Sequence, residues 1–209
     1  MKKWNGLGLA PSLFFIMEKK KLILATNNNH KVEEINHFIG EKFELVTLNQ
    51  IGFEGDIDET GATLAENSQL KAEFIFEKFG LDCLADDSGL EVFNLNMEPG
   101  VYSARYAGEK RNDIDNMNHL LKKMDNIVDR GAQFRTVITL IIEGKINQFE
   151  GIVKGQILKQ PIGNQGFGYD PIFVPEGHQK TFAEMDLGEK NLLSHRTRAL
   201  KKMNDFLGE

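Results

Sequence analysis

The chain has 209 residues, of which 41% are hydrophobic and 27% charged, and this composition suits one large domain with a substantial core. Acidic residues outnumber basic ones by 31 to 25, so the net charge of -6 argues against a broad nucleic-acid-binding surface, although a local basic pocket could hold a small anion. The single cysteine excludes an internal disulfide and favours a reducing, cytoplasmic setting, and no apolar run approaches the ~20 residues that span a bilayer.

The first segment of the chain has no periodic pattern. Residues 1–16 carry two lysines and a short apolar run at residues 13–16, which follows Pro11. This run is too short for the hydrophobic region of a signal peptide. We therefore expect a flexible leader or extension at residues 1–16, followed by a single domain at residues 17–209.

A polar loop separates the first predicted strand from the first predicted helix. Residues 22–25 predict a buried strand, and apolar residues at helical spacing predict a helix over residues 32–39. The loop between them, TNNNHK at residues 26–31, places free backbone N–H groups at a helix start, where an anion is stabilised, and Lys31 adds a full positive charge. An asparagine-rich helix cap without a ligand explains this junction equally well.

The next strand is followed by an acidic loop and a second helix. Residues 43–48 predict the strand, and one carboxylate of the loop at residues 49–61 could serve as a metal ligand. Thr63 and Glu66 form a capping-box pattern that predicts a helix to about residue 79. Lys71 lies within this helix, and the default expectation for such a lysine is the solvent-exposed surface.

The central polar stretch is Asp86-Asp87-Ser88-Gly89. Apolar segments at residues 83–85 and 90–95 flank it and predict the ends of two strands with a turn between them. Because adjacent residues on an extended chain point to opposite faces, we expect the two aspartates to differ, one facing a cleft and the other holding the turn. An ordinary polar turn is the alternative.

Two loops of the second half are candidates for binding. The first contains Tyr102, Arg105 and Tyr106, and two tyrosines around an arginine are typical of a binding surface or a subunit interface. The second, at residues 163–170, is rich in glycine, so its backbone could approach a ligand closely while the ring of Phe167 stacks on a base. A turn without a ligand is the alternative for the second loop.

Helices interleaved with strands in the first half, and a run of strands in the second, predict an α/β fold. We expect a mixed, strongly twisted sheet flanked by helices, in two lobes with a central cleft that holds the ligand. The remaining elements predicted in the second half are a helix at residues 114–124, antiparallel strands at 134–142 and 146–157, a strand at 172–174, and one final helix from about 186 to 207 that carries Lys190, His195 and Arg196.

Taken together, these motifs resemble the inosine triphosphate pyrophosphatase family, and the resemblance spans residues 21–207. The loop at residues 26–31 is similar to the family's Thr-Gly-Asn-x-x-Lys, with Asn27 in place of the glycine. Asparagine tolerates left-handed backbone conformations better than most residues. The other matching segments are ENSQLKA at residues 66–72, ADDSGL at 85–90, PGVYSARY at 99–106, GFGYDP at 166–171 and SHR at 194–196.

The resemblance implies that the chain hydrolyses non-canonical purine nucleoside triphosphates, those of inosine, deoxyinosine and xanthosine, to the monophosphate and pyrophosphate. It implies magnesium as the cofactor, Asp87 as the catalytic base and a metal ligand, Glu54 as a second metal ligand, and a homodimer. The residues implied in substrate binding are Thr26, Asn27, Asn28, Asn29, His30, Lys31, Lys71, Ser88, Phe167, Gly168, Tyr169, Asp170, Lys190, His195 and Arg196.

Two other functions are compatible with the residues alone. A nucleotide-binding regulator without turnover would use the same phosphate loop and base pocket, but it would have no need of a carboxylate such as Asp87 beside the phosphates. A scaffold protein whose polar clusters are turns would show no thermal shift with nucleotide and magnesium. A panel of nucleotides, scored for the release of monophosphate and pyrophosphate, distinguishes the three functions.

Overall fold

The computed structural model describes residues 19–39 and 41–208, so the leader predicted at residues 1–16 lies outside the described residues. The strands are β1 (Lys20–Leu24), β2 (Phe43–Thr47), β3 (Cys83–Val92), β4 (Gly131–Ile142), β5 (Lys145–Ile157) and β6 (Phe173–Pro175). They form a six-stranded sheet in the order β2-β1-β3-β4-β5-β6. β1 pairs in parallel with β2 and β3, whereas β3 to β6 pair antiparallel, which confirms the predicted mixed sheet.

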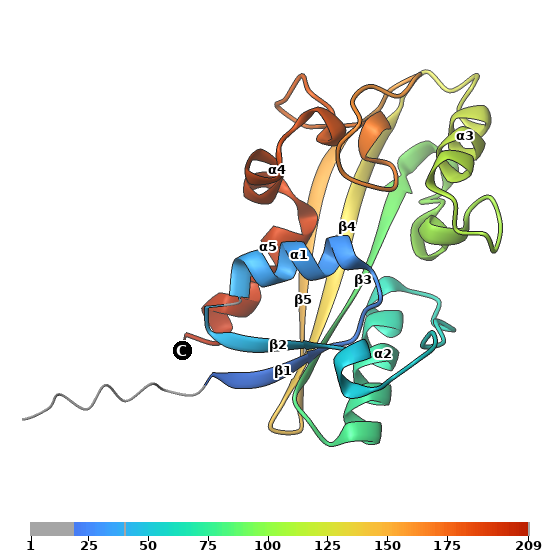
Figure 1. The fold of residues 1–209 in the computed structure, drawn as a ribbon. Helices are drawn as coiled ribbons and strands as arrows, with labels where there is room; N and C mark the ends of the chain where they lie inside the picture. The colour runs from blue at the N-terminus through green and yellow to red at the C-terminus, as the bar shows by residue number, and fades with distance from the viewer. Residues whose placement is uncertain (1–18, 40, 209) are drawn as a thin grey trace, which may run out of the picture.

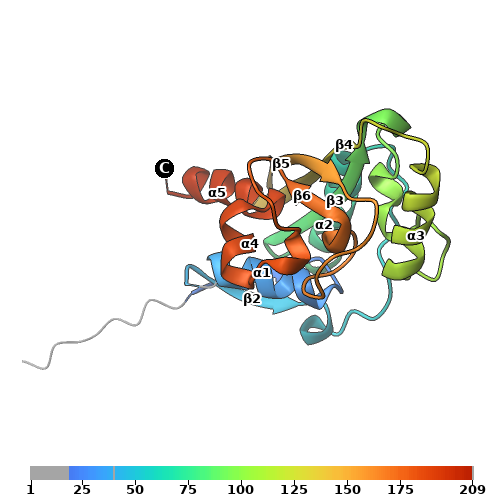
Figure 2. The ribbon, with the colours of Figure 1, turned by 90° about the horizontal axis from the view of Figure 1, so that it is seen from above.

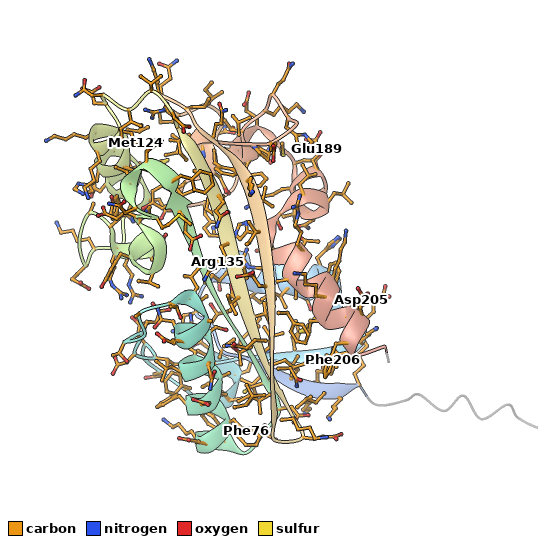
Figure 3. The ribbon with its side chains drawn as sticks, turned by 180° about the vertical axis from the view of Figure 1, so that it is seen from behind. Phe76, Met124, Arg135, Glu189, Asp205 and Phe206 are labelled. Carbon is orange, nitrogen blue, oxygen red and sulfur yellow. The ribbon has the colours of Figure 1, made fainter. Side chains whose placement is uncertain are left out.

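Helices cover both faces of this sheet. β1 and β2 lie almost across the direction of β4 and β5, so the predicted strong twist is confirmed (Figure 1). From behind, Phe76 of α2 and Phe206 of α5 lie on either side of the long strands (Figure 3). In the part of the chain that the structure describes, no helix has the length and apolar character needed to cross a membrane. The α-helices are α1 (Asn29–Ile39), α2 (Leu64–Phe79), α3 (Asp113–Lys123), α4 (Leu187–Leu193) and α5 (His195–Phe206), and a 3-10 segment, η3, covers Gly100–Arg105.

Alternation along β1 divides the core between the two faces. Leu22 and Leu24 pack in a cluster with side chains of α1 and α5, whereas Ile23 packs on the other face with side chains of α2. A third cluster around Phe134 and Phe173 contains residues of α3 and of the far ends of β4 and β5. From above, α3 lies on one side of the molecule and α1 and α4 on the other (Figure 2).

The predicted capping box of α2 is confirmed. The Thr63 side chain accepts a hydrogen bond from the Glu66 backbone N–H, and the Glu66 side chain accepts one from the Thr63 backbone N–H. At the other end, Gly80 adopts a left-handed conformation with φ 64°, and its N–H donates to the Phe76 carbonyl. Both ends of the helix that carries Lys71 are therefore fixed by local sequence.

The turn predicted at residues 86–89 is wrong, because β3 runs through these residues. Residues 83–92 form one continuous strand, and they pair with β4 from Cys83 opposite Ile141 to Val92 opposite Ala132. The polar residues stay in the strand because tertiary partners compensate their charges, which local propensity does not register. Gly89 has a packing role instead, since a Cβ there would lie 2.4 Å from the Gly100 carbonyl oxygen of η3.

The single final helix that was predicted is also wrong, because the structure has two helices, α4 and α5. Ser194 separates them with an extended conformation, φ -62° and ψ 153°. Its side chain accepts a hydrogen bond from the Thr197 N–H and so caps α5. The break redirects the chain, and His195 and Arg196 occupy the first turn of a new helix.

Cys83, the only cysteine of the chain, begins β3 beneath α2. It is fully buried, and its thiol donates to the Ala72 carbonyl oxygen at 3.2 Å. Burial raises the pKa of this thiol to about 12. The thiol is therefore a packing group without nucleophilic character at neutral pH.

Candidate active site

A cavity of about 390 Å³ lies where the carboxyl end of β1 meets the middle of β3. Its walls come from segments far apart in the sequence: the loop before α1, the acidic loop before α2, β3, η3, the loop at residues 163–170, α4 and the first turn of α5. The predicted site residues that line it are Thr26, Asn27, Asn28, Lys31, Lys71, Asp87, Ser88, Phe167, Gly168, Tyr169, Asp170, Lys190, His195 and Arg196.

Asp86 anchors two cations on the face of β3 that looks toward α1 and α5. Its Oδ2 lies 3.0 Å from Nζ of Lys31 and 3.3 Å from Nε of Arg196, and it accepts a hydrogen bond from Ser88 Oγ at 3.2 Å. Burial raises the pKa of Asp86, but Lys31 and Arg196 outweigh burial and hold this pKa well below its usual range. Asp86 therefore holds an ion-pair network and not a turn.

Glu34, which the sequence did not single out, extends this network across α1. Its carboxylate pairs with Nζ of Lys190 at 3.1 Å and with Nη1 of Arg196. Lys190 in turn lies 2.8 Å from Oδ2 of Asp170. Burial raises the pKa of Glu34, but Arg196 and Lys190 outweigh it and lower the pKa below its ordinary value. A pattern of polar residues on a helix face cannot distinguish such a buried carboxylate from a solvated one.

Asp87 points to the other face of β3, where Lys71 lies. Lys71 is only 7% exposed, so the expected surface position is wrong. Its Nζ donates to Glu59 Oε1 at 2.7 Å and to the Asp86 carbonyl at 2.8 Å, and it lies 3.5 Å from Oδ1 of Asp87. Burial lowers the pKa of Lys71, but Asp87 and Glu59 outweigh it and leave the pKa above its ordinary value.

The charge of Asp87 is compensated less completely than that of Asp86. Its Oδ1 accepts a hydrogen bond from the Ser88 backbone N–H at 3.0 Å. Each aspartate keeps one buried oxygen without a partner among the described residues, Oδ1 in Asp86 and Oδ2 in Asp87. Burial raises the pKa of Asp87 even though Lys71 and Lys31 oppose the shift. This arrangement suits a carboxylate that gains a cation or a proton when a ligand binds.

The loop at residues 26–31 caps α1 and also forms part of the cavity wall. Asn28 Oδ1 accepts hydrogen bonds from the N–H groups of His30 at 3.0 Å and Lys31 at 3.3 Å, so it caps α1 while it lines the cavity. Asn27 replaces the family's glycine without a left-handed conformation, and its Nδ2 donates to the Gly55 carbonyl at 2.9 Å. The substitution therefore leaves the backbone unstrained and ties this loop to the acidic loop.

Another part of the cavity wall is aromatic. Phe167 presents its ring there, with Nζ of Lys190 4.8 Å from the ring centroid. The ring of His195 stacks on that of Phe134 with centroids 4.8 Å apart. Burial and the neighbouring Arg196 lower the pKa of His195 well below its ordinary value, so the imidazole is neutral and donates from one nitrogen only.

Comparison with known proteins shows the family of the chain. The model of the Ham1 family matches residues 22–206. The chain belongs to the Ham1 family. A dITP/XTP pyrophosphatase of Flavobacterium psychrophilum is 52% identical over 89% of this chain and 98% of its own length, and one of Bacillus licheniformis is 43% identical over 91% and 99%. The Ham1 protein of Staphylococcus aureus superposes with a TM-score of 0.83 at 39% identity, over 90% of this chain and 98% of its own.

Three positions that the Ham1 family resemblance implied lie away from the cavity. Asn29 and His30 are exposed on the first turn of α1, and the His30 ring stacks on Phe167. Glu54 is exposed in the acidic loop, whereas Glu59, five residues later, lines the cavity and contacts Lys71. Several carboxylates in one irregular loop look alike in sequence, and only the path of the loop shows which one reaches the site.

Proposed function

We propose that this chain hydrolyses the triphosphates of inosine, deoxyinosine and xanthosine to the nucleoside monophosphate and pyrophosphate. The observation that carries the proposal is Asp87, a buried carboxylate with an unpartnered oxygen that lines the same cavity as Lys31 and Lys71. A protein that only binds nucleotides gains nothing from an under-compensated negative charge beside phosphates. The relatives named dITP/XTP pyrophosphatase support the same reaction.

The two ends of the cavity support one orientation of the substrate. Lys31, Lys71 and the N–H groups at the start of α1 suit the outer phosphates, since cations and helix starts stabilise negative oxygens. Phe167 and the neutral imidazole of His195 suit a purine at the opposite end. Asp87 lies between these groups in the sequence, and with the base and the outer phosphates held by them we propose that the α-phosphorus lies beside Asp87.

Magnesium is the proposed cofactor, and two carboxylates at the cavity fit it. Asp87 offers its unpartnered Oδ2, and Glu59 offers a carboxylate that lies against Lys71. Burial raises the pKa of Glu59, but Lys71 outweighs it and lowers the pKa, so Glu59 is ionised at neutral pH. The described residues include no group of three acidic, His or Cys side chains that could hold a metal ion, which suits a metal that also takes phosphate oxygens as ligands. When bound, magnesium screens the phosphates and stabilises the departing oxygen.

Asp87 then acts as the general base. As water attacks the α-phosphorus, a bond forms from the water oxygen to phosphorus, the bond from phosphorus to the bridging oxygen breaks, and Asp87 accepts the water proton. Lys31 and Lys71 stabilise charge on the phosphate oxygens during this displacement. No covalent nucleophile is required, which agrees with the inert, buried thiol of Cys83.

The base end of the cavity supports a preference for a purine with an oxygen at C6. Arginine has five N–H donors, and the contacts of Arg196 with Glu34, Asp86 and Ser88 occupy three of them. A donor of Arg196 and the N–H of His195 are therefore free for that oxygen. Adenine carries an amino group there and would leave buried donors unpaired, so we expect strong discrimination against adenosine triphosphate.

Hydrolysis of inosine triphosphate in oxygen-18 water tests the reaction. With magnesium present, we expect the label in inosine monophosphate and unlabelled pyrophosphate, as detected by mass spectrometry. Label in orthophosphate or pyrophosphate, or accumulation of inosine diphosphate, would show that the substrate lies the other way along the cavity. Binding of inosine triphosphate without any product would favour the non-catalytic regulator.

We also propose that the chain forms a homodimer through the segment around η3. Tyr102 is 58% exposed there, and the guanidinium of Arg105 lies 5.5 Å from its ring centroid. Exposed tyrosines and arginines are enriched in subunit interfaces. Light scattering of the wild type and of Tyr102→Glu tests this assembly, and a monomeric wild-type protein would exclude it.

A further inference from the structure

His30 occupies a position that the phosphate-loop resemblance does not explain. Its ring stacks on that of Phe167, with centroids 5.1 Å apart and an interplanar angle of 8°. Phe167 lines the cavity, whereas His30 lies outside it on the exposed first turn of α1. The imidazole therefore covers one face of a ring that lines the cavity. This contact joins two segments that are far apart in the chain.

The backbone around Phe167 is already held by other contacts. The Phe167 N–H donates to Oδ2 of Asp170 at 2.9 Å, and the next N–H, of Gly168, donates to Oδ2 of Asp113 at 2.7 Å. Gly166 has no room for a side chain, because a Cβ there would lie 2.1 Å from Oδ2 of Asp170. These bonds fix the loop, but none of them fixes the side-chain torsion angles of the phenyl ring.

The ring of Phe167 has neighbours that act on its orientation. Nζ of Lys190 lies 4.8 Å from its centroid, and the guanidinium carbon of Arg196 lies 6.0 Å from it. Both cations are committed to carboxylates of the ion-pair network around Glu34. His30 is the stacked aromatic neighbour among the described contacts of this ring, and it comes from the helix that begins at the phosphate loop.

We propose that His30 is a positioning residue that holds Phe167 ready to stack on the purine, and that it does not bind phosphate. The proposal rests on the proposed function, because it assigns the Phe167 end of the cavity to the base. Stacking of aromatic rings contributes beyond simple area burial, and a pre-ordered ring spares the ligand the cost of ordering it. The effect falls on ground-state binding, since neither ring touches the α-phosphorus.

His30→Ala and His30→Phe separate this role from an electrostatic one. The alanine variant removes the stack, whereas the phenylalanine variant keeps an aromatic ring and removes the imidazole nitrogens. We expect His30→Ala to raise both the KM for inosine triphosphate and the Kd for inosine monophosphate, by between roughly twofold and tenfold, with kcat unchanged. His30→Phe should restore both constants. His37→Ala, in the last turn of the same helix, is the control that should change neither.

Three results would overturn the proposal. A His30→Phe variant as impaired as His30→Ala would assign the effect to the imidazole nitrogens. A loss for inosine triphosphate without a loss for inosine monophosphate would place His30 at the outer phosphates. A lower KM in His30→Ala would mean that the imidazole blocks the ring. Failure of the proposed function itself is distinguishable, because the wild-type protein would then not hydrolyse inosine triphosphate.

Discussion

The two faces of β3 treat neighbouring aspartates in opposite ways. Toward α1 and α5, Asp86 contacts a buried arginine, a partly buried lysine and a hydroxyl, and its pKa lies well below the usual range. Toward α2, Asp87 is 3.5 Å from Lys71, and burial raises its pKa. One residue of separation along a strand is enough to shift the pKa values of the two carboxylates in opposite directions.

This difference in charge compensation explains how β3 can carry the unfavourable buried charge of Asp87 and still stay in place. The two cations on the Asp86 face connect β3 to α1 and α5, so the strand is fixed independently of Asp87. Asp87 can then change its proton or metal partner while the strand stays in place. Stability and chemistry should therefore separate between the two faces, and substitutions can test this separation.

The largest effect is expected for Asp86→Asn. The substitution leaves Lys31 and Arg196 buried with weaker partners, so the free energy of unfolding should fall by about 3–5 kcal/mol, the range for a broken buried ion pair. Urea denaturation measures it. Glu91→Gln is the matched control on the same strand, because the cation paired with Glu91, Arg135, is partly exposed and the other partner of Glu91, Gln133, is uncharged. An Asp86→Asn loss no larger than that of the control would contradict the structural role.

Asp87→Asn should affect catalysis instead of stability. Turnover of inosine triphosphate should fall by at least ~100-fold, the lower end for general-base catalysis. Because burial disfavours the Asp87 charge, the metal-free variant should unfold at a temperature equal to or above that of the wild type. Steady-state kinetics and calorimetry give the two values. A well-folded variant with near wild-type turnover would contradict the assignment of Asp87 as the general base.

The pH dependence of stability should have opposite signs for the two variants in the absence of metal. The pKa of Asp87 is raised in the folded state, so its ionisation costs stability above that pKa, and the advantage of Asp87→Asn should shrink as the pH falls toward 3.8. The pKa of Asp86 is depressed, so its stabilisation is complete above 3.8, and the deficit of Asp86→Asn should shrink only below that pH. Denaturation curves across this range with a chelator present measure both trends, and trends of the same sign would refute the comparison.

The smallest effect concerns a buried hydroxyl on each face. Thr136 lies 2.6 Å from Ser88 Oγ on the Asp86 face, and Thr139 lies 2.7 Å from Ser68 Oγ on the α2 face. Since Ser88 donates to Asp86, Thr136 must donate to Ser88. Thr136→Val and Thr139→Val should each lower stability by about 1 kcal/mol. Thr136→Val should leave kcat/KM close to the wild-type value, because Thr136 lies on the face that carries stability, and an activity loss comparable with that of Asp87→Asn would argue against the separation of the two faces.

Local signals predicted much of this architecture. Alternation and apolar runs indicated the strands, and the Thr63–Glu66 pattern indicated the start of α2, because both depend on residues close in sequence. The supposed turn at residues 86–89 was wrong because Asp86 is stabilised by Lys31 and Arg196, which come from distant segments. Propensity counts a polar residue as exposed unless its partner is known.

The candidate site was predictable where motif and chemistry coincide, as at Lys31, Phe167 and Arg196, which all reach the cavity. It was not predictable where a charge depends on the path of a loop or on the interior face of a helix. Glu59 and Glu34 are such cases, since each has neighbours of the same residue type that stay in solvent. Ion pairs between distant elements leave no periodic trace in one sequence.

The burial of Cys83 makes the rate of thiol labelling a measure of local unfolding at β3. The chain holds one thiol, and α2 must separate from β3 before a water-soluble maleimide can reach it. The labelling rate therefore reports how often the wall that carries Lys71 detaches from the strand that carries Asp87. A ligand that contacts both residues links that wall to the strand, so its affinity can be read from slower alkylation without any chromophore or product assay.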